Sequence, residues 1–189
     1  MDMALVKERN FQIIVDIFTR HHCKWWLDAC TCLSAVRTGD FMALKDDIDI
    51  GLPSVHIDLW DTFIEDFEAV GFRLVKERVY KGRKVTIGFK GHSEKLDIYF
   101  YYEKGKYFWH PIFGRDDNGR GGKYRIFRVE KFSKHLFSNL KPIIFKERSC
   151  FLPNPPEQYL KERYGDWQIS NAKYRFWCDS KAIDMDFVV

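Results

Sequence analysis

The chain lacks any hydrophobic run long enough to cross a membrane. Its apolar stretches fall well short of the roughly 20 residues that a spanning helix needs. The N-terminal segment MDMALVKERN carries acidic residues and has no apolar core of the kind found in secretory signals. These absences predict a soluble protein that is not exported and works in the cytoplasm.

Paired cysteine motifs are also missing. The five cysteines form no CxxC pair, which is the spacing of structural zinc sites and thiol redox motifs. We therefore expect reduced thiols in the core. Internal repeats, low-complexity tracts and convincing linkers are absent as well, so residues 1–189 are expected to form a single domain that buries a core without metal or disulfide staples.

Charge is distributed unevenly along a composition that is otherwise typical of a folded protein. Hydrophobic residues make up 46%, aromatic residues 17% and charged residues 31% of the chain, with a net charge of +4. Arg115–Arg148 holds ten Lys/Arg and four Asp/Glu, a local charge of +6. This basic segment suits a phosphate-bearing partner, although a solvated surface stretch is the alternative interpretation.

Apolar spacing predicts a mixture of helices and strands. Helices are expected at residues 3–21, 31–36, 55–70, 130–138 and 156–164. Strands are expected at residues 25–28, 47–52, 72–80, 83–89, 95–102, 124–129 and 142–146, the third to fifth of them forming a meander. Residues 103–123 are rich in glycine and charge and are expected to form a long loop.

Two aspartates separated by one apolar residue, Asp47-Ile48-Asp49, begin a predicted buried strand. Alternate strand residues share a face, so the two Cα atoms would lie about 7 Å apart. Two ionised carboxylates near a core are unfavourable unless a proton or cation lies between them. A divalent ion such as Mg²⁺ would satisfy them; solvent-facing acids at a strand end are the alternative.

A third acid, Asp97, lies inside the apolar strand KLDIYFYY. If its strand neighbours that of Asp47 and Asp49, the three carboxylates converge. Such a group can hold one or two Mg²⁺ (or Mn²⁺) ions for phosphoryl transfer. One of the acids could also act as general base on an acceptor hydroxyl.

Three stretches resemble motifs of the LicD family, which includes the fukutin-like proteins. WLDACTCLSAVRTGDFMALKDDIDIG resembles the family signature WLDGGTLLGAVRHGDFIPWDDDIDIG, LDIYFYY resembles its second acidic strand, and LPNPPEQYLKERYGDW resembles its closing element. The resemblance extends from about Phe11 to Trp167. It implies an α+β, nucleotidyltransferase-like fold, a mixed sheet flanked by helices similar to the DNA polymerase beta superfamily.

The resemblance also implies an activity. Family members are thought to transfer phosphocholine or a polyol phosphate from a CDP-linked donor to a glycan hydroxyl. Asp47, Asp49 and Asp97 would then be catalytic metal ligands, with Asp97 as ligand or base. The expected partners are a CDP-activated donor and a glycan or glycolipid acceptor, not nucleic acid, and the basic segment is compatible with peripheral membrane association. The alternatives are a nucleotidyltransferase that adds NMP to a protein, RNA or small molecule, and a non-catalytic relative.

The sequence departs from the family signature where a phosphate-cradling turn is expected. Ala29-Cys30 replaces the Gly-Gly pair, and Ser34 replaces a later glycine. Because glycine lets backbone approach phosphates closely and permits positive φ, these replacements are expected to reshape the donor pocket. The hydroxyls of Thr31 and Ser34 are candidate substrate contacts.

Three further residues follow from the same signature. Arg37 is the candidate contact for donor phosphate, a salt bridge to Asp28 or Asp40 being the alternative. Lys45, beside the acid pair, would either contact a phosphate or weaken metal binding. His110 is expected to be a packed or surface residue rather than a catalytic one.

Overall fold

The computed structural model describes residues 3–42, 47–91, 94–114, 126–171, 173–187 and 189. The helices are α1 (Met3–Arg20), α2 (Ala29–Arg37), α3 (Trp60–Ala69), α4 (Pro156–Tyr164) and α5 (Phe176–Asp179), with 3₁₀ helices η1 (Ser54–Leu59) and η2 (Lys134–Phe137). The strands are β1 (Trp26–Leu27), β2 (Ile48–Pro53), β3 (Arg73–Tyr80), β4 (Arg83–Gly91), β5 (Glu94–Lys104), β6 (Tyr107–Gly114), β7 (Ile126–Ser133), β8 (Lys141–Phe145) and β9 (Arg148–Leu152).

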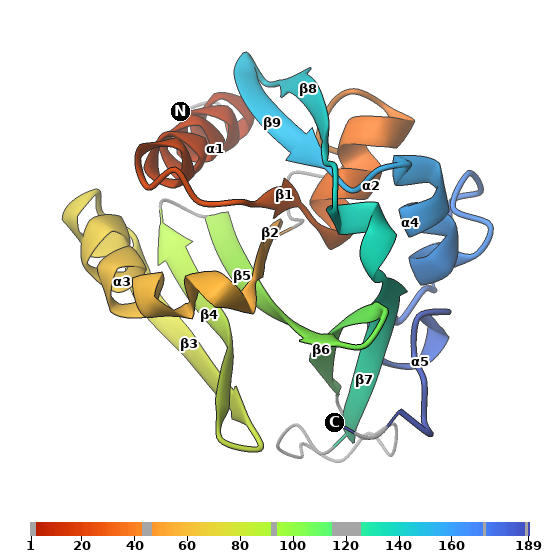
Figure 1. Cartoon of the computed structure of the whole chain (residues 1–189). Coiled ribbons are helices and arrows are strands. Elements are labelled where there is room, and N and C mark those ends of the chain that lie inside the picture. Colours follow the sequence, from red (N-terminus) through yellow and green to blue (C-terminus); the bar gives the residue numbers. More distant parts are fainter. Residues whose placement is uncertain (1–2, 43–46, 92–93, 115–125, 172, 188) are drawn as a thin grey trace.

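A seven-stranded mixed sheet organises the molecule (Figure 1). Its strand order is β1-β2-β5-β4-β3, with β6 paired to β5 and β7 paired to β6. Strands β2 and β5 are parallel, and the predicted meander β3-β4-β5 is antiparallel throughout. Strands β8 and β9 form a separate hairpin. The predicted α+β class, a mixed sheet flanked by helices, is confirmed.

Helices pack on the sheet through aromatic side chains. Figure 1 shows α1 and α3 together beside strands β3 to β5, and α2 and α4 together on the other side of β1 and β2. Phe18 of α1 contacts Phe63 and Phe67 of α3, and Phe67 contacts Phe89 of β4. Burial of these rings, each worth on the order of 2 kcal/mol, fixes the helices against the strands.

Several predicted boundaries were wrong. The helix expected at 55–70 starts as the 3₁₀ helix η1, because His56 has non-helical backbone angles (φ −94°, ψ 17°), and becomes α-helical only at Trp60. Residues Tyr107–Gly114, expected within a loop, form β6, whose aromatic side chains suit a strand paired along its full length to β7. Likewise β7 continues to Ser133 where a helix was expected, leaving only η2. Strand β9 and helix α5 were not predicted.

Two predictions from missing features can be compared with the structure. Cys32 and Cys150 are buried thiols, as expected, whereas Cys23, Cys30 and Cys178 are only partly buried. Over the part of the chain that is described, no helix combines the length and apolar character needed to cross a membrane.

Candidate functional site

The structure brings two of the predicted acids side by side. Asp49 on β2 and Asp97 on β5 are register partners in the parallel strand pair. They are only 6% and 7% exposed. The Tyr99 hydroxyl lies between them, 3.1 Å from Asp49 Oδ1 and 3.3 Å from Asp97 Oδ2. Parallel pairing of β2 with β5 therefore makes the two carboxylates one site, as the sequence predicted for neighbouring strands.

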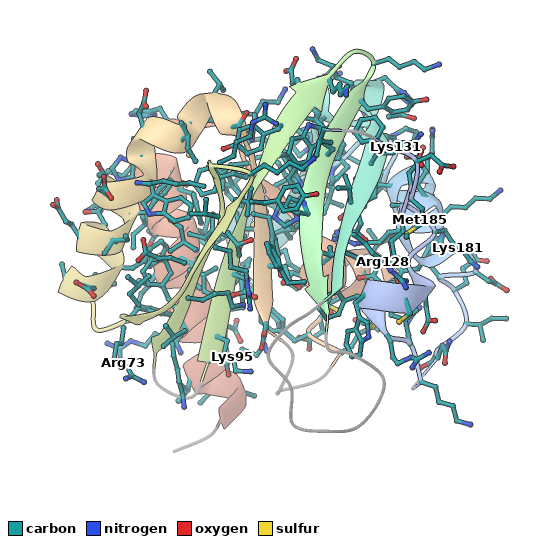
Figure 2. All side chains as sticks on the ribbon, turned by 90° about the horizontal axis from the view of Figure 1, so that it is seen from below. Arg73, Lys95, Arg128, Lys131, Lys181 and Met185 are labelled. Atoms are coloured by element: carbon teal, nitrogen blue, oxygen red, sulfur yellow. The ribbon has the colours of Figure 1, made fainter. Side chains whose placement is uncertain are left out.

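Asp47 lies just before β2, at the solvent edge of this pair. Its side chain is 34% exposed, and Lys95 Nζ is 3.5 Å from its Oδ1. Burial and the nearby charge of Asp97 raise the pKa of Asp47. Lys95 and Arg73 lie at the same end of the sheet (Figure 2). Asp47 is thus the member of the acid group that solvent reaches most easily.

Asp49 is a buried acid whose surroundings disfavour its ionised form. Burial, followed by the charges of Asp97, Asp28 and Asp47, raises the pKa of Asp49 well above its usual value. Its carboxylate accepts hydrogen bonds from the Cys30 N–H at 3.2 Å and from Tyr99. Among the described residues no cationic side chain forms a salt bridge with it. Such a carboxylate favours a bound proton or cation.

The acid pair suits a hard divalent cation. Within the described ranges no group of three or more His, Cys, Asp or Glu side chains is already arranged around a metal position. Mg²⁺, however, is commonly held by one or two carboxylates, with waters and substrate phosphates completing its shell. Two adjoining carboxylates, one of them lacking a cationic partner, match that requirement.

Hydrogen bonds connect the start of α2 to Asp49 of the acid pair. Asp28 caps α2 by accepting the Ala29 N–H at 2.8 Å. Ala29 has φ +39°, close to the left-handed conformation in which glycine is favoured. The Thr31 hydroxyl accepts the Asp49 N–H at 2.8 Å. Ala29 therefore retains the positive φ expected of the family's glycine.

The candidate substrate contacts have partners within the protein. The hydroxyls of Thr31 and Ser34 are buried, and Ser34 Oγ accepts the Met42 N–H at 3.4 Å. Arg37 Nη1 lies 3.5 Å from Met42 Sδ. Arg37 Nε is buried with no hydrogen-bond partner among the residues described. Substrate contacts by these residues stay predictions, and Lys45 lies outside the described residues.

Neither salt bridge considered for Arg37 is formed. Asp28 pairs with Arg163, and Asp40 pairs with Lys146. The Arg163 guanidinium is itself buried, with Nη1 2.9 Å from Asp28 Oδ1 and Nη2 2.5 Å from Glu130 Oε2. Tyr101 and Tyr159 also donate hydroxyl hydrogen bonds to Asp28. This network holds the turn before α2 against α4 and β7.

Sequence reasoning missed two side chains at the acid pair. Tyr99 follows Asp97 by two residues, so strand periodicity alone would have placed it on the same face. Lys76 of β3 lies with Nζ 2.7 Å from Asp97 Oδ1 and 2.5 Å from Oδ2. No sequence pattern marked Lys76, since the contact depends on how three strands are paired.

His110 is a core residue, as expected. Its ring is buried, and Nε2 lies 3.0 Å from the Val85 carbonyl oxygen. Burial lowers the pKa of His110 to about 3. The ring is therefore neutral near pH 7, and its contacts with Tyr99 and Tyr101 are packing contacts.

Most of the basic side chains of Arg115–Arg148 that the structure describes form ion pairs within the protein. Lys131, Lys134, Lys146 and Arg148 form ion pairs with Asp184, Glu103, Asp40 and Asp16, respectively. A hollow of about 560 Å³ lies beside Lys131, near the middle of this segment, and is also lined by residues that include Lys181 and Met185. Figure 2 shows these three on the opposite side of the view from Arg73 and Lys95. The hollow is therefore not part of the acid site.

Two curated relatives come from Rickettsia. The uncharacterized protein RP689 of Rickettsia prowazekii is 26% identical over 161 residues, covering 80% of this chain and 51% of the relative. The uncharacterized protein RT0683 of Rickettsia typhi is 22% identical over 152 residues, covering 80% of this chain and 43% of the relative. The chain thus spans about half the length of these relatives.

Solved structures of ANT(2″)-Ia show a partial likeness. A crystal structure in complex with adenylyl-2″-tobramycin matches with a TM-score of 0.42 and 17% identity, covering 55% of this chain and 54% of that chain. A solution structure of ANT(2″)-Ia matches with a TM-score of 0.43 and 17% identity, covering 56% and 52%.

The family profile described as LicD/FKTN/FKRP, nucleotidyltransferase domain, matches residues 22–155. That range includes the turn before α2, the strand of Asp49 and the strand of Asp97. The chain therefore belongs to the LicD/FKTN/FKRP family and carries its nucleotidyltransferase domain.

Proposed function

We propose that this member of a transferase family is a metal-dependent enzyme that moves a substituted phosphate, phosphocholine or a polyol phosphate, from a CDP-activated donor to a hydroxyl of a glycan or glycolipid. The observation that carries the proposal is the buried pair formed by Asp49 and Asp97 on adjoining parallel strands. Such a pair has no purpose in packing, because burying like charges side by side costs stability.

Asp49 and Asp97 would hold Mg²⁺ or Mn²⁺, with Asp47 as a further ligand or as the base. When bound, the ion would polarise the phosphoryl group and neutralise the leaving nucleotide. Among the three acids, Asp47 is the best placed to accept the proton of an incoming hydroxyl, since it is partly exposed and its pKa is raised. Both oxygens of Asp97 are engaged by Lys76.

Cationic side chains beside the acids would orient donor phosphates. Arg73, Lys90 and Lys95 are cross-strand partners in one row at the end of the sheet, and all three are exposed. This basic row neighbours Asp47 through the Lys95 contact. Arg37, at the C-terminal end of α2, has one buried guanidinium donor unused among the described residues. Guanidinium and ammonium groups bind phosphate oxygens through charge-assisted hydrogen bonds.

Two other functions each have one observation in their favour. The family description names a nucleotidyltransferase domain, which favours transfer of NMP to a protein, RNA or small molecule. The ion pair of Lys76 with Asp97 favours a non-catalytic relative whose acid pair is neutralised internally. The first differs from our proposal in which half of the donor reaches the acceptor, and the second predicts no turnover at all.

A thermal-shift panel tests the proposal. CDP-choline, CDP-glycerol, CDP-ribitol, ATP and UTP would each be added with and without Mg²⁺, because a ligand that binds the folded state raises the melting temperature. A metal-dependent shift selective for one CDP-linked compound is expected in the wild-type protein and not in Asp49→Asn. The proposal is wrong if no nucleotide shifts the melting temperature, or if Asp49→Asn leaves the shifts unchanged. Product analysis of the selected donor would then separate phosphocholine or polyol phosphate transfer from NMP transfer.

A further inference from the structure

Four residues form one line across the sheet. Lys76 on β3 is the register partner of Gly88 on β4, Gly88 is the partner of Asp97 on β5, and Asp97 is the partner of Asp49 on β2. Register partners project from the same face of a sheet. A cation is therefore aligned with the acid pair across the intervening strand.

A bulge in β3 places Lys76 on this face. Leu74 pairs with Phe89 and Lys76 pairs with Gly88, so Val75 is an extra residue in the strand. Phe89 and Gly88 point to opposite faces, hence Leu74 faces the core and Lys76 faces the acids. In a regular strand Lys76 would share the face of Leu74 and could not reach Asp97.

Gly88 keeps the path between the two side chains open. A Cβ atom at Gly88 would lie 2.6 Å from Asp97 Oδ1 and 2.9 Å from Lys76 Cβ. Both distances are shorter than nonbonded carbon contacts allow. Lys76 can thus extend over β4 and place its ammonium on both carboxylate oxygens of Asp97.

We propose that Lys76 is an internal counter-cation that competes with the divalent metal ion for Asp97 and thereby sets the metal affinity of the site. This inference rests on the proposed function. The ammonium contacts both oxygens of Asp97, so a metal ion that approaches this carboxylate meets a positive charge already placed there and binds more readily where Lys76 withdraws. The Lys76 side chain is 28% exposed and can withdraw toward solvent. Asp49, which has no such counter-ion among the described residues, stays available to the metal.

A merely structural lysine would behave in the opposite way. If Lys76 only held Asp97 in place, its removal would loosen the carboxylate and weaken metal binding. If it competes, its removal frees the carboxylate and strengthens metal binding. The direction of the change in metal affinity therefore distinguishes the two roles, whatever happens to stability.

The test measures Mn²⁺ binding by titration calorimetry and by the electron paramagnetic resonance spectrum of unbound Mn²⁺. Lys76→Met keeps a long unbranched side chain, one atom shorter, and removes the charge, and Lys76→Gln serves if the methionine variant does not fold. Lys84→Met is the matched control, because Lys84 is a lysine on the same sheet that contacts an exposed carboxylate, Asp61, at 3.5 Å. We expect Lys76→Met to bind Mn²⁺ about 10-fold tighter or more, within the range seen for residues that contact metal ligands, and Lys84→Met to match the wild type.

Equal or weaker binding by both Lys76 variants would overturn the inference. Asp49→Asn separates this failure from failure of the proposed function. If Asp49→Asn abolishes Mn²⁺ binding while the Lys76 variants gain none, only the role of Lys76 is wrong. If Asp49→Asn binds Mn²⁺ as the wild type does, or if no variant binds it, the metal site itself is wrong and both proposals fail.

Discussion

Asp49 and Asp97 share a single hydroxyl, that of Tyr99, which lies 3.1 Å from one carboxylate and 3.3 Å from the other. A hydroxyl has one proton, so it can donate to only one of them at a time. Lys76 neutralises Asp97, while Asp49 has no ion-pair partner in the part of the chain that is described. Keeping Asp49 ionised is therefore a cost to the metal-free fold.

Asp49→Asn is expected to stabilise the metal-free protein while removing its response to metal. The amide keeps an oxygen to accept the Cys30 N–H and can donate to the Tyr99 hydroxyl oxygen, whose proton then goes to Asp97, and the buried carboxylate is gone. A gain of roughly 1 kcal/mol would raise the melting temperature by about 2–4 °C for a chain of this size. Melting curves with and without Mg²⁺ measure both effects. A lower melting temperature without metal would contradict the view that burying the Asp49 carboxylate costs stability.

Arg163→Met is expected to be severely destabilising. The guanidinium lies between the buried carboxylates of Asp28 and Glu130, so its loss removes the cation that both of them pair with. Breaking a buried pair in this way costs about 3–5 kcal/mol. Chemical denaturation would measure the loss.

A triple variant provides the control for Arg163. Asp28→Asn and Glu130→Gln, added to Arg163→Met, remove the stranded charges and should recover a large part of the lost stability. If the triple variant is no more stable than Arg163→Met alone, packing of the arginine, rather than charge, determines its contribution.

The acid pair was predictable because it depends on local pattern and one strand pairing. Asp47 and Asp49 alternate with an apolar residue, and Asp97 lies within an apolar strand. Both patterns predict a strand with a polar position on one face. The helix boundaries of α1 and α4 followed from apolar spacing and from Pro156 and Gly165. The helix boundaries need only neighbours in sequence, whereas the acid pair also needs the pairing of β2 with β5.

The rest depends on tertiary pairing that sequence does not display. Lys76 reaches Asp97 through a bulge at Val75 and the missing side chain of Gly88. Arg163 lies more than a hundred residues from Asp28 and meets it only when α4 packs beside α2. Strand β6 was expected in a loop because residues 103–123 are rich in glycine and charge, although its full pairing with β7 outweighs that signal.

Ala29→Gly is expected to leave stability unchanged or raise it by up to about 1 kcal/mol. Ala29 has φ +39°, and the left-handed region costs a residue with a Cβ roughly 1–2 kcal/mol. Glycine removes that strain but loses more backbone entropy on folding, which offsets part of the gain. Denaturation midpoints would measure the balance. Ala35→Gly, inside the same helix α2, is the matched control and should destabilise by about 1 kcal/mol.

The low pKa of His110 in the folded protein predicts how stability depends on pH. Its pKa falls from 6.5 to about 3 in the folded protein, so between these values the unfolded chain binds a proton that the folded chain does not. Stability contributed by neutral His110 is complete above pH 6.5 and is lost as the pH falls toward 3, at about 1.4 kcal/mol per pH unit. His110→Gln should flatten the dependence of the unfolding free energy on pH between about pH 6 and 4 by that slope. Equal slopes in variant and wild type would contradict a buried neutral ring, and His135→Gln, at an exposed position, should keep the wild-type slope.

Gly88→Ala should disturb the acid pair although it replaces no charged residue. Gly88 does not require a positive φ, so alanine fits its backbone, yet the new Cβ would meet Asp97 Oδ1 at 2.6 Å and Lys76 Cβ at 2.9 Å. Asp97 must move or its ion pair must break, which is expected to cost about 1–3 kcal/mol of stability. Calorimetry with Mn²⁺ should also detect altered metal binding, because the carboxylate can no longer stay in register with Asp49. Lys84→Ala, at an exposed position of the same strand, should keep the metal affinity of the wild type. If Gly88→Ala also melts and binds Mn²⁺ as the wild type does, then the gap at Gly88 is not what aligns Lys76 with Asp97.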